Sequence, residues 1–415
     1  RFGIMRKYHT HITLIFLACI LYVMANFQRV AIPGAIFDTL QADLHANAPI
    51  ITSFGATFMY TYAFSLLAIG MLVDRFSGVK VILWGGSLFA IGALIFPNTT
   101  CLPLLYFSRM LLGAGAACFY LSLVQEVKKC FPDKYFGISV SLMLITGYMG
   151  GVCANAPFII VSHAFSWQAV MNVLAIITLV VVLVYAFVLH FLHGVPQNEH
   201  VHFSLEPFKD VLSKHFNRNL YMFAGLNYGL YYVIQTVIGV KFLKDFVNLS
   251  ATQASVALSV MVVIAGVSGL SLATLSKLCN NRRVIFMKSV CLFTTAIFTI
   301  IFLCLLFDIR THLIVYMLML VAIGGGMSPL LVPIIHGTNK YEVRGTALSI
   351  MNCCFFLSVG ILASLVGILL DVYAPVSNSV GHLVYSNKSY MLVFGTFILF
   401  SLVEMYNVFK LRDVE

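Results

Sequence analysis

Apolar runs of the length that crosses a lipid bilayer recur along the whole chain. A spanning helix needs about 20 consecutive, mainly apolar residues. Twelve runs meet this need, at residues 11–36, 50–73, 80–97, 103–125, 137–162, 167–192, 220–244, 251–275, 283–306, 312–335, 345–370 and 389–409. We therefore predict an all-α integral membrane protein with twelve transmembrane helices. The longest polar stretch predicts a cytoplasmic linker at 193–218, between six-helix bundles at 1–192 and 219–415.

The composition supports a membrane protein and argues against a soluble one. Of the 415 residues, 60% are hydrophobic and only 10% are charged, whereas soluble domains carry about 25% charged residues. The net charge of +10 could indicate nucleic-acid binding, but the basic residues lie in short connections between the apolar runs. We therefore expect the lipid bilayer, and no nucleic acid, as a partner.

The sequence lacks the patterns of the common enzyme and metal sites. No CxxC metal spacing, HExxH, GxSxG or Walker loop is present, and most of the ten cysteines lie within apolar runs. We expect no cofactor, no metal and no enzymatic activity.

The distribution of Lys and Arg predicts the orientation, since the cytoplasmic side carries their excess. With the N-terminus inside, 18 of the 25 fall in cytoplasmic segments, four in outer loops, including Lys241 and Lys244, and three within spans. We predict that both termini are cytoplasmic, in the inner or plasma membrane.

The two halves of the chain carry related segments. Gly70–Ile82, after the second span, has a degenerate counterpart after the eighth, and Tyr135–Ser139 has one at Tyr341–Thr346. Internal repeats of this kind surround the binding site in many transporters. Glycines 324–326 with nearby prolines predict a hinge in span 10, and the alternative is that they only allow close helix packing.

The Gly70–Ile82 segment resembles the signature loop of the major facilitator superfamily, and Arg109–Ala117 resembles that superfamily's second motif. The resemblance covers nearly the whole chain, and it implies the superfamily's fold of two pseudo-symmetric bundles and transport by alternating access. It also implies a gate formed by Asp74, Arg75 and Lys80, with Glu126 as a partner. The alternative is that these charges are only solvated loop residues.

Two arginines fall within the predicted spans, Arg29 late in span 1 and Arg109 in span 4. An ionisable side chain in the membrane costs at least about 2.5 kcal/mol and is usually kept for function. No acid falls near the centre of a span, because Glu126, Asp371 and Glu404 are predicted at span ends. A net positive cavity selects an anion, which guanidinium groups bind. The alternatives are that Arg29 extends to the outer surface and that Arg109 supports helix packing.

The segment around Arg29 is similar to the first helix of the anion:cation symporters and the organophosphate:phosphate antiporters. The symporters commonly carry acids where this chain has Gln28 and Ala116, which puts proton coupling through those positions in doubt. The antiporters carry a second arginine in span 7, where this chain has Asn227. A monocarboxylate or a zwitterion fits one or two arginines better than a phosphate does.

Span 7 carries Tyr228, Tyr231, Tyr232 and Gln235 at intervals of three or four residues. This spacing places them on one helix face. Because their polar groups need partners within lipid, we predict that they face the central cavity. The alternative is that the tyrosines anchor the helix at the membrane interface.

Together these patterns predict a secondary transporter, acting as a monomer, that moves a small organic anion such as a carboxylate or sugar acid. The predicted site comprises Arg29, Gln28, Arg109, Asn227 and the span 7 stripe, and a proton or counter-solute is the expected coupling partner. An exporter of drugs or metabolites and a solute sensor that does not transport are the alternatives.

Overall fold

The computed structural model describes residues 2–190 and 204–413, without the side chains of residues 2–8, 74, 133–134 and 136–137. Within these ranges ten helices are long and apolar enough to cross a membrane, and α6 with α7 forms an eleventh crossing bent by 43°. The continuous run α10–η3–α11 over residues 215–245 forms the twelfth. The prediction of twelve spanning helices in an all-α membrane protein is confirmed.

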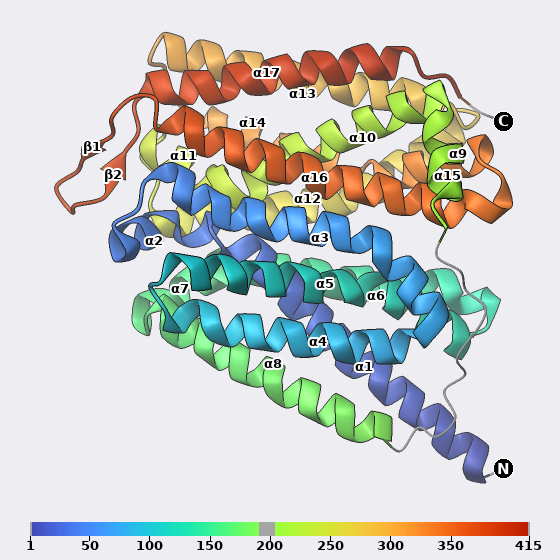
Figure 1. The fold of residues 1–415 in the computed structure, drawn as a ribbon. Coiled ribbons are helices and arrows are strands. Elements are labelled where there is room, and N and C mark those ends of the chain that lie inside the picture. The colour runs from blue at the N-terminus through green and yellow to red at the C-terminus, as the bar shows by residue number, and fades with distance from the viewer. Residues whose placement is uncertain (1, 191–203, 414–415) are drawn as a thin grey trace.

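The helices form two layers of parallel and antiparallel rods, one from each half of the chain (Figure 1). The N-terminal half contains α1 (Phe2–Ala31), η1 (Gly34–Ile36), α2 (Phe37–Leu44), α3 (Ala48–Phe76), α4 (Gly78–Ile95), η2 (Phe96–Asn98), α5 (Leu102–Cys130), α6 (Asp133–Cys153), α7 (Ala156–Ala164) and α8 (Trp167–His190).

The C-terminal half begins with a short amphipathic helix and ends with the last long helix. It contains α9 (Glu206–Ser213), α10 (His215–Val233), η3 (Ile234–Ile238), α11 (Gly239–Asp245), α12 (Ala251–Leu278), α13 (Arg283–Leu306), α14 (Leu313–Leu320), η4 (Val321–Gly326), α15 (Ser328–Thr338), η5 (Tyr341–Val343), α16 (Arg344–Leu370), β1 (Val376–Ser377), β2 (Leu383–Val384) and α17 (Asn387–Phe409).

The two ends of the molecule differ. The β1–β2 hairpin and α2 lie at one end, called here the hairpin end, while α1 begins and α17 ends at the other, called the terminal end (Figure 1). Of the predicted linker at 193–218, residues 193–203 lie outside the described residues, and 215–218 already belong to α10.

Local sequence signals explain where several spans begin and end. Asn47 and Ser250 cap α3 and α12 by accepting hydrogen bonds from backbone N–H groups, and Ser250 forms a capping box with Gln253. The first helix ends earlier than predicted, at Ala31, because Pro33 has no N–H and restricts the residue before it.

Small residues allow the halves to approach closely at the hairpin end. A Cβ atom added to Gly34 would lie 2.5 Å from the backbone oxygen of Thr236, and one added to Gly367 would lie 2.0 Å from Oγ1 of Thr52. Thr236 belongs to η3, a π-helical turn that interrupts the seventh span. Such turns are rare and often lie at functional sites.

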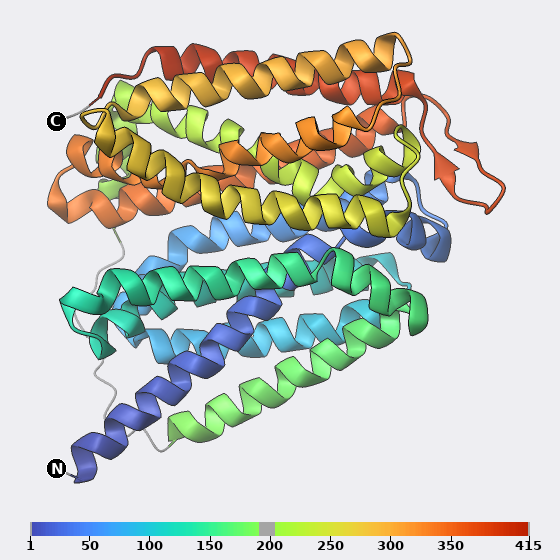
Figure 2. The same cartoon turned by 180° about the vertical axis from the view of Figure 1, so that it is seen from behind.

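The halves separate toward the terminal end. Near the hairpin end α7 and α12 are joined, because the Ala156 N–H donates to the Ser259 hydroxyl at 3.3 Å. Toward the terminal end α6 and α12 diverge (Figure 2). With the close contacts of Gly34 and Gly367, the structure is therefore closed at the hairpin end.

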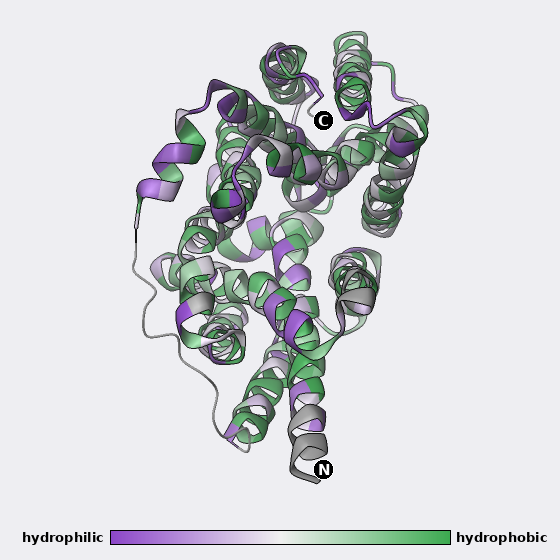
Figure 3. Ribbon diagram, turned by 90° about the vertical axis from the view of Figure 1, so that its right-hand side faces the viewer, coloured by the Kyte–Doolittle hydropathy of each residue, from purple (hydrophilic) through white to green (hydrophobic). Residues whose placement is uncertain are grey.

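The outer faces of both bundles are apolar, as the view along the helices shows (Figure 3). Large apolar side chains such as Phe16 and Phe187 are each 65% exposed on them. This arrangement is stable only where hydrocarbon, rather than water, surrounds the protein.

We predict that Gly34→Ala opens the hairpin end. A methyl group 2.5 Å from the Thr236 oxygen overlaps it, and overpacking of this kind costs about 1–3 kcal/mol. The measurement is the distance between two spin labels, obtained by double electron–electron resonance. The labels are attached at Ala42→Cys and Val376→Cys, in a protein whose exposed cysteines 101, 153 and 279 are replaced by serine.

The expected result is a longer distance in the Gly34→Ala protein. Gly345→Ala is the matched control, because nothing lies within 4 Å of its added Cβ. An unchanged distance distribution for Gly34→Ala would contradict the proposed contact.

Candidate solute-binding site

A cavity of about 200 Å³ lies between the two halves, at the middle of the bundle. Residues from α1, α3, α5 and α6 line one side, and residues from α10, α12, η4, α15 and α16 line the other. Among the described residues that line it, Arg29 is the only charged side chain. The polar neighbours include Asn26, Ser328 and Asn352.

The Arg29 guanidinium is buried and faces this cavity. Its Cζ atom lies 4.4 Å from the centroid of the Tyr62 ring in the N-terminal half and 4.8 Å from that of Phe356 in the C-terminal half. Nε and Nη2 have no hydrogen-bond partner within the described part of the chain, and Arg29 forms no ion pair there. The side chain therefore does not extend to the surface, and it retains two donors for a ligand.

Arg109 is fully buried but does not line the cavity. Nε donates to the carbonyl of Phe54 at 3.0 Å, Nη1 to that of Gln28 at 3.3 Å and Nη2 to that of Ile32 at 3.2 Å. Two of these carbonyls lie at the C-terminal end of α1, where helix carbonyls lack intrahelical partners and a cation is favourable. Arg109 thus fixes the last turn of α1, which carries Arg29.

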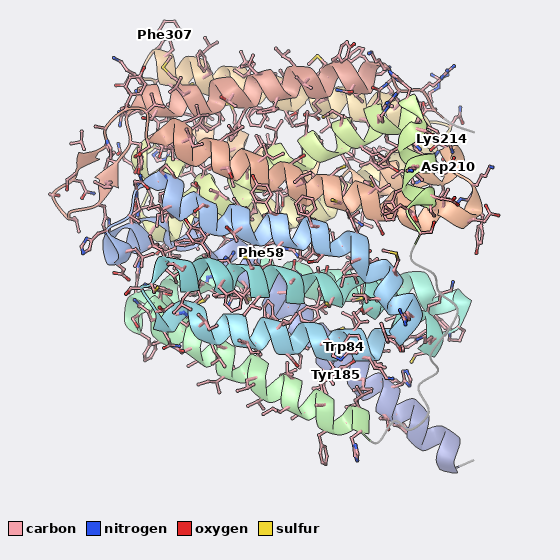
Figure 4. The ribbon with its side chains drawn as sticks, viewed as in Figure 1. Phe58, Trp84, Tyr185, Asp210, Lys214 and Phe307 are labelled. Carbon is pink, nitrogen blue, oxygen red and sulfur yellow. The ribbon has the colours of Figure 1, made fainter. Side chains whose placement is uncertain are left out.

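Phe58 connects the two guanidinium groups. Its ring centroid lies 4.8 Å from Cζ of Arg109 and 5.9 Å from Cζ of Arg29. The side chain is fully buried and belongs to α3 (Figure 4). Ring faces attract cations, so the aromatic ring supports both charges without neutralising either.

Tyrosines form most of the polar lining. Three come from the span 7 stripe, Tyr228, Tyr231 and Tyr232, and four from the N-terminal half, at 22, 62, 120 and 148. Tyr228 stacks on Tyr232 with centroids 5.0 Å apart and on Phe355 at 4.8 Å. The stacked rings form a wall against which a flat or apolar part of a solute can pack.

Three other residues of the predicted site point away from the cavity. Asn227 donates to Oε1 of Glu404 at 3.0 Å, and Gln235 donates to the Leu258 carbonyl at 3.0 Å. Gln28 is buried, and only its backbone carbonyl takes part in the contacts described above. Gln235 does not share a helix face with the three tyrosines because it lies in η3, a π-helical turn whose residues are spaced at a different angle.

Glu404 lies near the end of its span, as the sequence indicated, since α17 ends at Phe409. Its side chain is nevertheless fully buried inside the C-terminal bundle. The sequence pattern could not reveal this burial, because it depends on contact with Asn227, 177 residues away in the chain.

Sequence analysis also missed a group of ionised residues at the hairpin end, called here the hairpin-end cluster: Asp38, Lys241, Lys244 and Asp245. The Lys241 ammonium lies 2.6 Å from Asp38 and 2.8 Å from Asp245, and Lys244 also contacts Asp38. Lys241 had been assigned to an outer loop but is buried on α11. The spacing of four residues between Lys241 and Asp245, typical of helical ion pairs, was the available signal.

The hairpin-end cluster joins the two halves, because Asp38 belongs to α2 and both lysines to α11. Next to it, Gln41 donates to the Tyr385 hydroxyl at 2.8 Å. Burial raises the pKa of Asp38, but the two lysines outweigh this effect and hold the pKa below its ordinary value.

The predicted gate residues lie at the terminal end. Arg75 is exposed, with Cζ 5.1 Å from the Phe76 ring centroid, and Lys80 is half-buried. The side chain of Asp74 lies outside the described residues. Glu126 is buried within the N-terminal half, where it accepts hydrogen bonds from Lys129 at 2.8 Å and Ser77 at 3.3 Å and contacts His11 at 3.1 Å.

We predict that Arg109→Ala destabilises the protein. The substitution leaves three buried carbonyls without the Arg109 donor, at a cost of about 1–3 kcal/mol or more. The measurement is thermal unfolding of purified protein in detergent. Arg29→Ala is the comparison, because it removes a charge whose Nε and Nη2 have no partner within the described chain. Equal losses of thermal stability in the two variants would contradict these assignments.

We predict that the contribution of Asp38 to closure of the hairpin end does not change between pH 8 and pH 5. Since the pKa of Asp38 is lowered, its stabilising contribution is fully present above the ordinary carboxyl value of about 4. This stabilising contribution is lost only as the pH falls through the lower pKa that Asp38 has in the folded protein. The distance between the same two spin labels is the measurement. A longer distance at pH 5 than at pH 8 would contradict the prediction.

Comparison with known proteins agrees with this architecture. The sequence model of the Major Facilitator Superfamily matches residues 18–363. No curated protein matches the chain.

Two solved structures illustrate the similarity of fold. A bacterial homologue of the human lysosomal transporter Spinster, inward-facing and unoccupied, has a TM-score of 0.74 and 12% identity over 97% of this chain and 96% of its own. The nucleoside transporter NupG has a TM-score of 0.67 and 15% identity over 97% and 99%. At these identities the likeness concerns the fold alone, whereas the sequence match extends over most of the chain, and this protein therefore belongs to the major facilitator superfamily of membrane transporters.

Proposed function

We propose that the protein is a secondary transporter that moves a small organic anion, a carboxylate or sugar acid, across the membrane by alternating access. The observation that carries the proposal is the Arg29 guanidinium, which faces the central cavity with Nε and Nη2 unpartnered among the described residues. A buried charge without a partner is costly. A bound carboxylate would neutralise it and accept both hydrogen bonds.

The number of charges in the cavity supports a monoanion. Arg29 is the sole charged residue among the described lining residues, and Asn227 and Arg109 are engaged elsewhere. A dianionic phosphate would bring one more negative charge than this lining neutralises. The tyrosine wall supports a solute whose remaining part offers a flat face or hydroxyl groups, as aromatic acids and sugar acids do.

Orientation follows from the positive-inside rule, which places the terminal end in the cytoplasm. The structure then represents an inward-facing state, because the hairpin end is closed and α6 and α12 diverge at the other end (Figure 2). Opening of the hairpin end requires the hairpin-end cluster to separate and Gly34 to leave Thr236. In the opposite movement, Asp74, Arg75 and Lys80 would meet the C-terminal half as the inner gate.

Glu126 has a supporting role in this gate. Its contacts with Lys129 and Ser77 hold the turn between α3 and α4, where Ser77 adopts a φ of 74°. A Cβ on the neighbouring Gly78 would lie 2.7 Å from Oε1 of Glu126. The turn that carries the signature loop is therefore fixed to α5 and would move with the N-terminal half as one body.

An exporter of amphipathic compounds is the alternative that the aromatic lining favours. Such a protein would tolerate loss of the Arg29 charge, whereas an anion transporter would not. Transport assays on Arg29 variants therefore separate the two functions.

We predict that Arg29→Gln lowers the efficiency of uptake by at least about a hundredfold, since each hydrogen bond to a charged group contributes about 1.5–3 kcal/mol. Arg29→Glu abolishes uptake, and Arg29→Lys retains part of it because the charge remains without the paired donors. The assay is exchange of radiolabelled glucuronate in proteoliposomes, with other monocarboxylates, amino acids and sugar phosphates as competitors.

Lys277→Gln, which removes an exposed cation at the end of α12, is the matched control and should leave exchange unchanged. Competition by monocarboxylates but not by sugar phosphates is expected. Wild-type rates of exchange in Arg29→Gln would overturn the assignment of an anionic solute.

A further inference from the structure

Glu404 is a buried acid to which the proposed binding site gives no role. Its side chain is fully buried, and Oε1 accepts one hydrogen bond, from the Asn227 amide at 3.0 Å. Oε2 has no hydrogen-bond partner in the ranges that the structure describes. An acid in this position is rare in a membrane protein and is usually functional.

The surroundings of Glu404 provide no ion pair among the described side chains. The spanning parts of the helices packed against α17 contribute these titratable or charged groups: Tyr221, Tyr228, Tyr231 and Tyr232 from α10, Lys288, Cys291 and Cys304 from α13, and Cys353 and Cys354 from α16. The Cys291 thiol lies beside Glu404 and donates to the Ser401 carbonyl at 3.9 Å. The Lys288 ammonium lies over the Phe409 ring, 5.1 Å from its centroid.

The remaining groups do not supply a positive charge either. The Tyr221 hydroxyl donates to the Ala347 carbonyl, and the two cysteines of α16 are neutral thiols. A carboxyl group withdrawn from water without a cation is stable as the neutral acid. The closed environment of Glu404 therefore favours the protonated, neutral form of its carboxyl group.

The hydrogen bond to Asn227 connects this acid to the cavity wall. Asn227 precedes Tyr228, which lines the cavity. Both Asn227 and the lining residue Tyr231 contact the 3₁₀ segment η4: a Cβ on Gly324 would lie 3.2 Å from the Asn227 amide nitrogen, and one on Gly325 would lie 2.5 Å from the Tyr231 ring. A movement of η4 would shift the partner of the acid and the wall of the solute site together.

We propose that Glu404 is the proton-binding site that couples transport to a proton gradient. The carboxyl takes up one proton from water on one side of the membrane and is buried as the neutral acid. When movement of α10 and η4 admits water from the opposite side, the carboxyl releases the proton to that water and becomes a carboxylate, so that each cycle moves one proton across the membrane. The inference rests on the proposed function, because the proton accompanies the anion bound at Arg29.

The first test needs no knowledge of the solute. Infrared difference spectra of the purified protein between acidic and alkaline pH report the C=O stretch of protonated carboxyl groups. We expect a band that titrates in the wild type and is lost in Glu404→Gln, which keeps the acceptor for Asn227. Asp210→Asn, which removes an exposed acid on α9 (Figure 4), should retain the band.

A second variant guards against misfolding of the first. Asn227→Ala leaves the acid but removes its hydrogen bond, so the band should persist at a shifted frequency. An unchanged band in both Glu404→Gln and Asn227→Ala would overturn the proposal.

The second test separates coupling from binding. In proteoliposomes, Glu404→Gln should retain counterflow of glucuronate but lose accumulation driven by a pH gradient. Accumulation that still follows the gradient in this variant would overturn the role of Glu404. If the wild-type protein shows no counterflow of any monocarboxylate, the assignment of an anionic solute is refuted. The infrared result on Glu404 does not depend on that assignment.

Discussion

The arrangement of the whole site depends on the burial of the Arg29 guanidinium without a carboxylate beside it. The protein keeps this charge in place by contacts that do not neutralise it, namely the aromatic rings of Tyr62, Phe356 and Phe58. Arg109 contributes from a distance, since it binds the carbonyls that end α1 and so fixes the turn that carries Arg29. Carbonyl dipoles and ring faces thus hold two cations near one cavity. The negative charge that would neutralise Arg29 must come from a solute.

In the proposed alternating-access cycle the two ends of the molecule close in turn, and in this structure the hairpin end is the closed one. At the hairpin end, charge pairs and glycine contacts join α2 and η1 to α11 and η3. Buried ion pairs stabilise little but require defined geometry, so they suit a contact that must form and break. The segment of span 10 in which we predict a hinge is the 3₁₀ helix η4, which lies beside both Asn227 and Tyr231.

Much of the fold could be predicted from the sequence because lipid imposes strict limits on composition. The length of the apolar runs gave the number of spans, and the signature loop at Gly70–Ile82 identified the superfamily, which the family match confirms. The cavity positions of Arg29 and the three tyrosines follow from the same logic, since polar groups in a span must turn away from lipid.

The remaining site could not be predicted because it depends on contacts between segments far apart in the chain. The role of Arg109 depends on the end of α1, and the position of Gln235 depends on a π turn that no sequence pattern announced. The burial of Glu404 and of Lys241 depends on partners more than 100 residues away, Asn227 and Asp38. Hydropathy, which averages over neighbours in sequence, carries no information about such pairs.

The central claim is that an anion binds with its carboxylate at Arg29, and the most direct measurement is to locate such an anion in crystals of the protein. A bromine-substituted benzoate gives an anomalous diffraction signal that marks its position and direction. The account predicts a bromine peak within the central cavity, against the stacked tyrosines, with the carboxylate on Nε and Nη2 of Arg29. A carboxylate bound away from Arg29, or a peak confined to the outer surface at concentrations that inhibit transport, would contradict it.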